Sequence, residues 1–412
     1  YYDRVDTLLG ISGSREGIAH LPDGKYQRPV KLNCGEMLLK QAIMKMGRRL
    51  IPTPNGVTTD GVSNPYRQQC AGRGRCGRGC DLHAPMHSPT SLILPAQDTG
   101  NLTVRPNSTV SEVLVDAATG KASGVRVIDT VTKQVYDFKA RVVILAASTL
   151  ESTRIMMLST SRQYPNGIAN SSGALGHYFC EHIMGPGASG TLPMLRGRAV
   201  TNDDGRPGAT YLVRFRNVAE KHPDFLRGYG YQGSSGSAEY PGHAAQTPGF
   251  GSAFKARVRD EHPARISYTA FGEVLARRDN RVMLDPDVKD AWGIPVLKFD
   301  YRFQDNELKM MQDAADQAAE MLRAARAEDI RVRRDILTEG WSIHEMGTAR
   351  MGSDPTSSVT NSFGQTHDVK NLYVVDGAIF NSASCQNPTW TILALCWRAM
   401  DHLKDEMRKG NV

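Results

Sequence analysis

The spacing of apolar and polar residues predicts helices at the start of the chain and strands after them. Residues 1–49 have the pattern of helical segments around a Pro- and Gly-rich loop near residues 22–29. Residues 64–89 are dense in Gly, Cys, Arg and Pro, which predicts an irregular loop. Apolar alternation then predicts four short strands, at residues 102–104, 110–115, 124–128 and 135–138.

A nearly continuous apolar run at residues 141–147 predicts a parallel strand that is buried on both faces. Ser148 follows this run and Glu151 stands three residues later, which predicts a capping box at the start of the next helix. Near the end of the chain, residues 371–375 predict another strand, and a long helix is expected from Thr389 to about Met407.

The middle of the chain, residues 173–337, is richer in Gly, Pro and polar residues than either end. It contains strand-like runs at residues 211–215 and 266–271 and one clear helix from Asp305 to Arg326. Apolar residues recur at helical spacing along that helix, at Leu308, Met311, Ala315, Ala318, Leu322 and Ala325.

These patterns predict a mixed α/β (α+β) protein with two domains. The first is expected from both chain ends, residues 1–172 with the cysteine loop 64–89 and residues 338–412. The second, residues 173–337, is expected to contain an antiparallel sheet flanked by helices.

Composition and charge narrow the function classes. With 412 residues, 40% hydrophobic and 23% charged, the chain has the balance of a globular protein. Its net charge is +7, but basic and acidic residues alternate and no basic, aromatic-rich stripe occurs, so we expect no nucleic-acid partner. No apolar run approaches the roughly 20 residues of a transmembrane helix, so none is expected.

Three motifs near the end of the chain carry candidate chemistry. His344 stands in the segment Ile343–Gly352, Asp376-Gly377 ends the last expected strand, and Asn387-Pro388-Thr389 opens the last expected helix. Taken singly, these motifs are explained by a hydrogen-bonded structural histidine, a strand-ending turn and a helix cap with Pro in the first turn.

In this order and spacing, the three motifs resemble the end of the glucose-methanol-choline oxidoreductase family. Further segments resemble the same family: 1–13, 94–102, 145–152 and 280–295. The resemblance therefore covers essentially the whole chain and implies a Rossmann-like FAD-binding domain with a substrate domain. The family's glycine-rich phosphate loop is not matched. The two G-x-G-x-x-G segments, at 72–77 and 228–233, lack the strand-to-helix context that such a loop requires.

The resemblance also implies roles for individual residues. His344 matches the catalytic histidine, and Asn387 its partner, which would hold and orient the substrate oxygen. A neutral imidazole suits removal of a hydroxyl proton while hydride leaves the carbon for flavin N5. Other positions match cofactor contacts: Pro388 and Thr389 at a helix N-terminus facing the flavin, Asp376 and Gly377 towards the flavin and pyrophosphate, and Val113, Ala147 and Ser148 near the adenosine.

Cys70, Cys76 and Cys80 lie close together in the Gly-rich loop. They are incidental thiols, or a zinc site if His83 or His87 joins them, or ligands of an iron-sulfur cluster. Because four-iron clusters usually need four cysteines, three favour a 3Fe-4S cluster.

The same spacing resembles the bacterial FAD and iron-sulfur sugar dehydrogenases of this family, such as glucoside 3-dehydrogenase. That resemblance implies oxidation of a sugar or glycoside hydroxyl, a cytochrome c acceptor, a small chaperone or export subunit, and a periplasmic location. The alternatives are a cluster-free alcohol or sterol oxidase or dehydrogenase, a non-catalytic fragment, and a cytoplasmic location.

Overall fold

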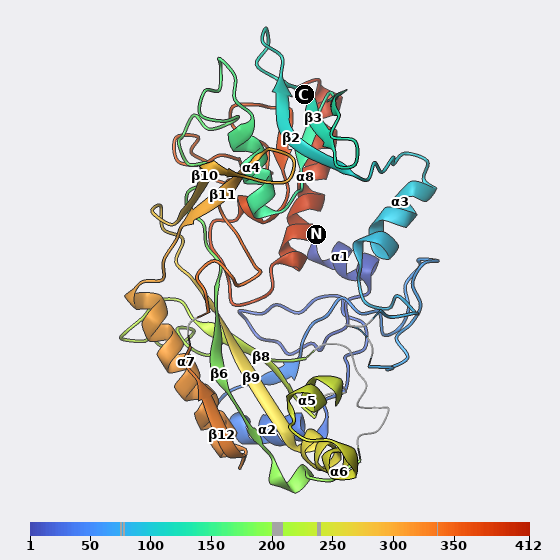
Figure 1. Cartoon of the computed structure of the whole chain (residues 1–412), viewed down its shortest axis with the longest axis vertical. Helices are drawn as coiled ribbons and strands as arrows, with labels where there is room; N and C mark the ends of the chain where they lie inside the picture. Colours follow the sequence, from blue (N-terminus) through green and yellow to red (C-terminus); the bar gives the residue numbers. More distant parts are fainter. Residues whose placement is uncertain (75, 77–78, 200–208, 237–239, 336) are drawn as a thin grey trace.

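The computed structural model describes residues 1–74, 76, 79–199, 209–236, 240–335 and 337–412. Figure 1 shows two lobes, one built on a large sheet and one on smaller sheets around α8 (Thr389–Lys409). The C-terminal segment after β12 (Glu328–Arg333) crosses from the first lobe to the second (Figure 1). No helix among the described residues is long and apolar enough to span a bilayer.

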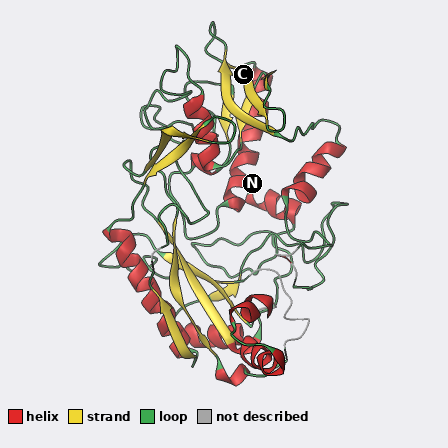
Figure 2. Cartoon of the chain, in the orientation of Figure 1, coloured by secondary structure: helices red, strands yellow, loops and turns green. Residues whose placement is uncertain are grey.

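The larger lobe contains a six-stranded sheet in which every neighbouring pair is antiparallel. In spatial order its strands are β1 (Leu50–Pro52), β7 (Thr210–Leu212), β8 (Tyr229–Ser235), β9 (Arg265–Glu273), β6 (His182–Thr191) and β12 (Glu328–Arg333). Two helices, α7 (Asp305–Ala324) and α2 (Cys34–Met44), pack together over this sheet. The expected antiparallel sheet with flanking helices is thus present, and Figure 2 shows it as one continuous group of strands.

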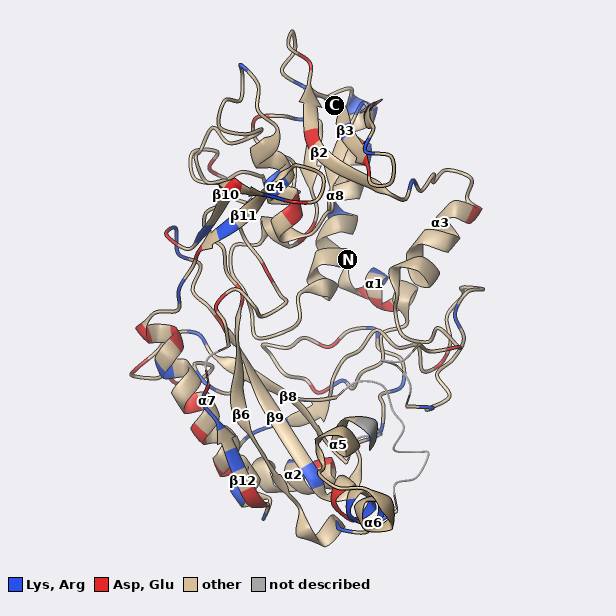
Figure 3. Cartoon of the chain, in the orientation of Figure 1, with Lys and Arg blue, Asp and Glu red and all other residues tan. Residues whose placement is uncertain are grey.

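Helix α7 buries a stripe of small and flexible apolar side chains, because charged residues occupy its other faces (Figure 3). Met310, Met311 and Ala314 belong to the main core, and a capping box between Gln304 and Glu307 closes the helix start. The expected stripe is confirmed except at Leu308, which is 38% exposed. Met310, two positions along, is buried in its place.

Strand alternation decides which side chains of the sheet meet the helices. The hydroxyl of Tyr231 on β8 donates to the carbonyl of Ala314 on α7, 2.7 Å away, so Tyr231 points to the helix-covered face. Successive side chains of a strand point to opposite faces, so Gln232 points away from α7. On β9, Tyr268 and Ala270 belong to the same core, and Phe271 faces the side of Gln232.

The second lobe contains three small sheets, separate from one another in Figure 2. They are β2 (Ser108–Val115), β3 (Ala122–Asp129) and β4 (Val135–Lys139); β5 (Val143–Leu145) with β13 (Leu372–Val374); and β10 (Arg281–Lys289) with β11 (Pro295–Asp300). Strands β5 and β13 pair in parallel although more than 200 residues separate them, so segments from both halves of the chain build this lobe. The helices α4 (Thr149–Leu158) and α8 (Thr389–Lys409) belong to the same lobe.

Each lobe also contains segments from the residue range of the other expected domain. Strand β1 and helix α2 come from residues 1–172 but pack with the six-stranded sheet. The hairpin β10–β11 comes from residues 173–337 but packs against α4. Arg154 of α4 fixes the hairpin, with hydrogen bonds of 2.7 Å to the carbonyl of Pro295 and 2.7 Å to the carboxylate of Asp290.

Several local predictions were wrong. Residues 102–104 form no strand, and the strand expected at 211–215 ends at Leu212. Ile144 of β5 is 41% exposed, so the strand is not buried on both faces within this chain. Two helices were missed, α5 (Tyr240–Gln246) and α6 (Gly251–Glu261), because α6 buries only Val258 and shows no apolar stripe.

The capping box expected at Ser148 was also wrong. Ser148 has a φ of 76° and makes no side-chain cap, and Glu151 instead bonds Arg154. Of the two rejected glycine motifs, residues 228–233 lie at the start of β8, which continues to Ser235, so this motif does not open a helix and the rejection is confirmed. The other motif includes Gly77, which lies outside the described residues.

The remaining helices complete the fold. Helix α1 (Tyr2–Leu9) packs against α8, and the short α3 (Leu94–Asp98) follows the cysteine loop. The helical segments expected in residues 1–49 are thereby present, as α1 and α2.

Candidate active site

The segment around His344 passes between the two lobes and is bonded to both. Met346 exchanges two backbone hydrogen bonds with Cys180, of 2.8 and 2.9 Å, which ties the segment to the start of β6. The next amide, of Gly347, donates to the carbonyl of Gly377 at 3.1 Å. His344 therefore stands at the junction between the large sheet and the β13 turn.

His344 lies against two aromatic rings of the large sheet. Its ring centroid is 6.3 Å from that of Phe271 and 4.9 Å from that of His182, which meets it edge-on. Its Nδ1 is buried and makes no hydrogen bond with any described residue. Burial lowers the pKa of His344, so the ring is neutral and able to accept a proton at neutral pH.

His182 is a neighbour that sequence reasoning missed. It is fully buried, and neither ring nitrogen makes a hydrogen bond within the described part of the chain. Burial lowers its pKa to about 3, with a smaller contribution from His344, and the nearby backbone of Gly272 and Ser384 offsets only part of this shift. The signal available in the sequence was an ionisable pair, Glu181-His182, at the start of an otherwise small and apolar strand.

Asn387 is exposed beside the first turn of α8, and a residue of the large sheet orients it. The Nε2 of Gln232 donates a hydrogen bond of 2.5 Å to the Oδ1 of Asn387, which leaves the Nδ2 amide group to donate elsewhere. Gln232 pairs with Thr269 on β9, two residues before Phe271. Gln232 and Phe271 thus connect Asn387 and His344 through adjacent strands.

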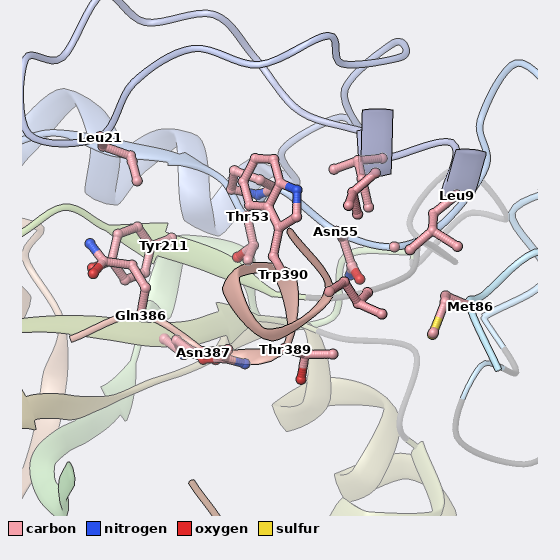
Figure 4. A pocket seen from close by; sticks show the side chains of 16 residues that line it. Leu9, Leu21, Thr53, Asn55, Met86, Tyr211, Gln386, Asn387, Thr389 and Trp390 are labelled. Carbon is pink, nitrogen blue, oxygen red and sulfur yellow. Dashed lines mark hydrogen bonds between the residues drawn. The ribbon is translucent and has the colours of Figure 1, made fainter. Parts of the chain in front are cut away.

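Two cavities meet at Gln232. One, of about 250 Å³, lies between α1 and α8 and is lined by Asn387, Thr389 and mostly apolar side chains, among them Trp390 and Leu9 (Figure 4). The other, of about 590 Å³, lies on the sheet face beside Phe271 and also carries Thr269 and Arg333. Gln232 could not be singled out from the sequence alone, because a glutamine on a strand is ordinarily only a solvent-facing residue.

The residues expected near the cofactor gather where the parallel strands β5 and β13 end. Ala147 and Ser148 follow β5, and Asp376 and Gly377 follow β13, so both pairs lie beyond the carboxyl ends of their strands. In open α/β sheets, dinucleotides bind at this edge.

The Asp376 carboxylate stabilises the two turns at this edge through hydrogen bonds. It accepts hydrogen bonds from the Ala378 amide, at 3.0 Å, and from the hydroxyl of Ser152, which in turn accepts from the amide of Ala147. Burial raises the pKa of Asp376, and these donors offset part of the rise. Ser152 thus joins the two turns, a role that the sequence did not indicate.

Gly377 fits the same edge closely. A Cβ there would lie 2.5 Å from the Oγ1 of Thr149 and 2.8 Å from the carbonyl of Glu345. The turn therefore packs directly against α4 and the segment that carries His344, with no room for a side chain. The edge that these turns form, beyond the ends of two parallel strands, fits a dinucleotide such as FAD.

The other expected cofactor contacts lie on separate elements. Val113 is buried in the core of the second lobe, and its amide already donates to the Ser159 hydroxyl at 2.7 Å. Pro388 is the N-cap of α8 and Thr389 its first residue, at the rim of the smaller cavity.

The three loop cysteines influence one another electrostatically. Burial raises the pKa of the Cys76 thiol, and the charges of Cys70 and Cys80 raise it further. Among the described residues, no three His, Cys, Asp or Glu side chains are grouped as metal ligands. The loop adjoins the smaller cavity, because the Met86 amide donates to the carbonyl of Gly56 at 2.6 Å and both residues line it.

Comparison with known proteins identifies relatives over the whole chain. Family models described as GMC oxidoreductase match residues 25–184 and 276–396. A 2-methyl-1,2-propanediol dehydrogenase from Mycolicibacterium austroafricanum is 30% identical, over 98% of this chain and 72% of that protein. The fructose dehydrogenase large subunit of Gluconobacter japonicus is 24% identical, covering 100% and 74%, and the gluconate 2-dehydrogenase flavoprotein of Pantoea cypripedii is 27% identical, covering 100% and 71%.

Solved structures share the fold. A variant of the formate oxidase from Aspergillus oryzae aligns with a TM-score of 0.61 at 13% identity, over 93% of this chain and 74% of that one. The matched segments include the His344 motif, the Asp376 turn and the start of α8. The chain belongs to the glucose-methanol-choline (GMC) oxidoreductase family, the FAD-dependent enzymes that oxidise alcohols.

Proposed function

We propose that the enzyme oxidises a hydroxyl group of a sugar or glycoside, with His344 as the base and Asn387 as the group that holds the substrate oxygen. One observation carries the assignment of these two residues. A neutral, half-buried imidazole and an amide with a free Nδ2 stand over the same sheet face, next to Phe271 and Gln232. Of the other titratable side chains in the junction, Glu181 is committed to backbone hydrogen bonds and His182 is fully buried.

The chain's residues divide the work of the reaction. Bound FAD supplies the hydride acceptor. His344 takes the hydroxyl proton, because burial keeps its imidazole neutral and leaves no competing donor at Nδ1. Asn387 donates its Nδ2 hydrogen to the same oxygen, where negative charge develops as the proton leaves.

The substrate class is supported by the larger cavity and by the relatives. That cavity joins the reaction centre at Gln232 and Phe271, and it offers Thr269 and Arg333 as hydrogen-bonding groups among apolar side chains. Such a mixed lining suits a ring with several hydroxyl groups better than it suits a hydrocarbon chain. The relatives named for fructose and gluconate are consistent with this class.

Replacement of His344 by Ala tests the base. We expect the variant to fold, because no hydrogen bond to a described residue is lost, while flavin reduction by substrate slows by about two to four orders of magnitude. His20→Ala, which changes an exposed histidine, is the matched control. Single-turnover reduction of H344A at the wild-type rate would remove His344 from the mechanism.

For electron exit, we propose that Cys70, Cys76 and Cys80 ligate a 3Fe-4S cluster that passes electrons to a cytochrome c in the periplasm, with a small export subunit as a further partner. The spacing of the three thiols and their mutual effect on the pKa of Cys76 support the cluster. Electron paramagnetic resonance of the oxidised, iron-loaded protein should show a signal that Cys76→Ser abolishes. Cys34→Ser, which changes an exposed cysteine elsewhere, is the control and should keep the signal. A silent wild-type spectrum would rule the cluster out.

A further inference from the structure

Three consecutive residues, the last two before β6 and the first of the strand, hold the segment that carries His344. Cys180 exchanges backbone hydrogen bonds with Met346, two residues after His344. His182 donates its backbone amide to the Ser342 hydroxyl at 3.1 Å and meets the His344 ring edge-on. Glu181, between them, has a fully buried side chain that points to the same segment.

The Glu181 carboxylate binds the backbone just before His344. Its Oε1 accepts from the Gly340 amide at 2.6 Å, and its Oε2 accepts from the Ser342 amide at 2.7 Å. Charge-assisted hydrogen bonds of this length are among the strongest that a loop backbone makes. The carboxylate thus fixes two alternate amides of the turn at once.

Packing of the loop's own side chains does not hold this turn. Trp341 is 68% exposed and Ile343 is 69% exposed, so neither large apolar side chain anchors it. Ile343 also has a φ of 61°, in the left-handed region that a β-branched residue rarely adopts. A backbone in such a conformation persists only where its surroundings impose it, and the bonds from Glu181 on the preceding residues impose it here.

We infer that Glu181 is a positioning residue for His344: its carboxylate fixes the turn 340–342 and the strained Ile343, and thereby sets the direction of the catalytic imidazole. This inference rests on the proposed role of His344 as the base. Glu181 does not touch the imidazole itself; it acts through the backbone. Its loss should therefore leave substrate binding in place and lower the rate of proton removal.

Glu181→Gln tests this role, because an amide presents one accepting oxygen and turns its NH₂ group towards the other backbone amide. We expect the limiting rate of flavin reduction to fall about tenfold or more, with the substrate dissociation constant changed less than about threefold. Independently of activity, hydrogen exchange in the peptide 338–344 should accelerate.

Epistasis with His344 separates positioning from general stability. In the H344A background there is no imidazole to position, so adding E181Q should slow flavin reduction no further. Glu307→Gln is the matched control. That carboxylate is equally buried and accepts from the backbone amides of Leu275 and Gln304, so its loss should lower the melting temperature without changing the reduction rate.

The outcomes separate this inference from the proposed function. If E181Q slows the wild type and H344A by the same factor, Glu181 acts only through stability and the inference is overturned. If H344A reduces its flavin normally, the proposed base is wrong, whatever E181Q does. Should E181Q not fold, Ser342→Ala removes the hydroxyl that His182 binds, and the same dependence on His344 is then expected at a loss of about threefold.

Discussion

Gln232 donates from its side-chain nitrogen to the side-chain oxygen of Asn387, 2.5 Å away, across the boundary between the large sheet and α8. The bond decides which end of the Asn387 amide faces the reaction centre. With its oxygen occupied, Asn387 presents Nδ2 as a donor. A donor stabilises the negative charge that develops on the substrate oxygen, whereas an acceptor would compete with His344 for the hydroxyl proton.

Substitutions at Gln232 should therefore rank in a particular order. Gln232→Leu removes the donor and lets the Asn387 amide rotate, which should slow flavin reduction by roughly three- to tenfold, the equivalent of one hydrogen bond. Gln232→Glu replaces the donor with an acceptor and turns the Asn387 oxygen towards the substrate, so it should be slower still. Stopped-flow reduction measures both, and Gln163→Glu, at an exposed site of the other lobe, controls for the added charge. Equal rates for the Leu and Glu variants would mean that Gln232 does not set the orientation.

Gly377 should tolerate no side chain. An alanine Cβ would lie 2.5 Å from the Oγ1 of Thr149 and 2.8 Å from the backbone oxygen of Glu345, and a backbone oxygen cannot rotate away. We expect Gly377→Ala to lower the free energy of unfolding by about 1–3 kcal/mol and to weaken FAD retention, because the displaced turn forms the expected cofactor edge.

Thermal denaturation and the flavin content after gel filtration measure these two effects. Gly242→Ala is the control, because a Cβ there meets no atom within 4 Å. If G377A is less stable but keeps its full flavin content, the turn does not contribute to cofactor binding.

The sequence was most informative where chemistry and periodicity are both local. The stripe of α7, the three strands β2–β4 and the order of the C-terminal motifs all lie within short windows, and the family resemblance on those motifs is confirmed by comparison. The assigned roles of His344 and Asn387 remain predictions.

What the sequence could not predict depends on contacts between distant segments. Gln232 and Asn387 are 155 positions apart, and Glu181 and Ser342 are 161 apart, so no local pattern marks either pair. The mistaken cap at Ser148 has the same origin, because Ser152 bonds Asp376, 224 positions later, and the chain enters α4 in a different conformation.

His182 should make the protein sensitive to acid. Burial lowers its pKa to about 3, against 6.5 for the ordinary group, so between these values the unfolded chain binds a proton that the folded one does not. Its contribution to stability is therefore complete above pH 6.5 and is lost as the pH falls towards 3, with a slope of up to about 1.4 kcal/mol per pH unit. Chemical denaturation of His182→Leu at a series of pH values should show that slope removed.

The comparison must be made against wild type at each pH. Asp6, whose pKa burial raises to about 6 from 3.8, contributes a slope of opposite sign in part of the same range. Because Asp6 is present in both proteins, its effect cancels in the difference. His20→Leu, which changes an exposed histidine, is the matched control. A His182→Leu curve parallel to wild type would show that His182 titrates normally.

Arg154 should contribute much more to the stability of the fold than an exposed arginine that also pairs with carboxylates. Its guanidinium is buried and bonds the Asp290 carboxylate and the carbonyls of Pro295 and Ile294, so its removal leaves all three acceptors without that donor. We expect Arg154→Met to lower the free energy of unfolding by about 3–5 kcal/mol, as for other broken buried pairs. Arg126→Met, which breaks an exposed bidentate pair with Asp137, should cost about 0–1 kcal/mol. Urea denaturation measures the free energy of unfolding of both variants. An equal decrease in the two would show that the junction of α4 with the β10–β11 hairpin does not depend on Arg154.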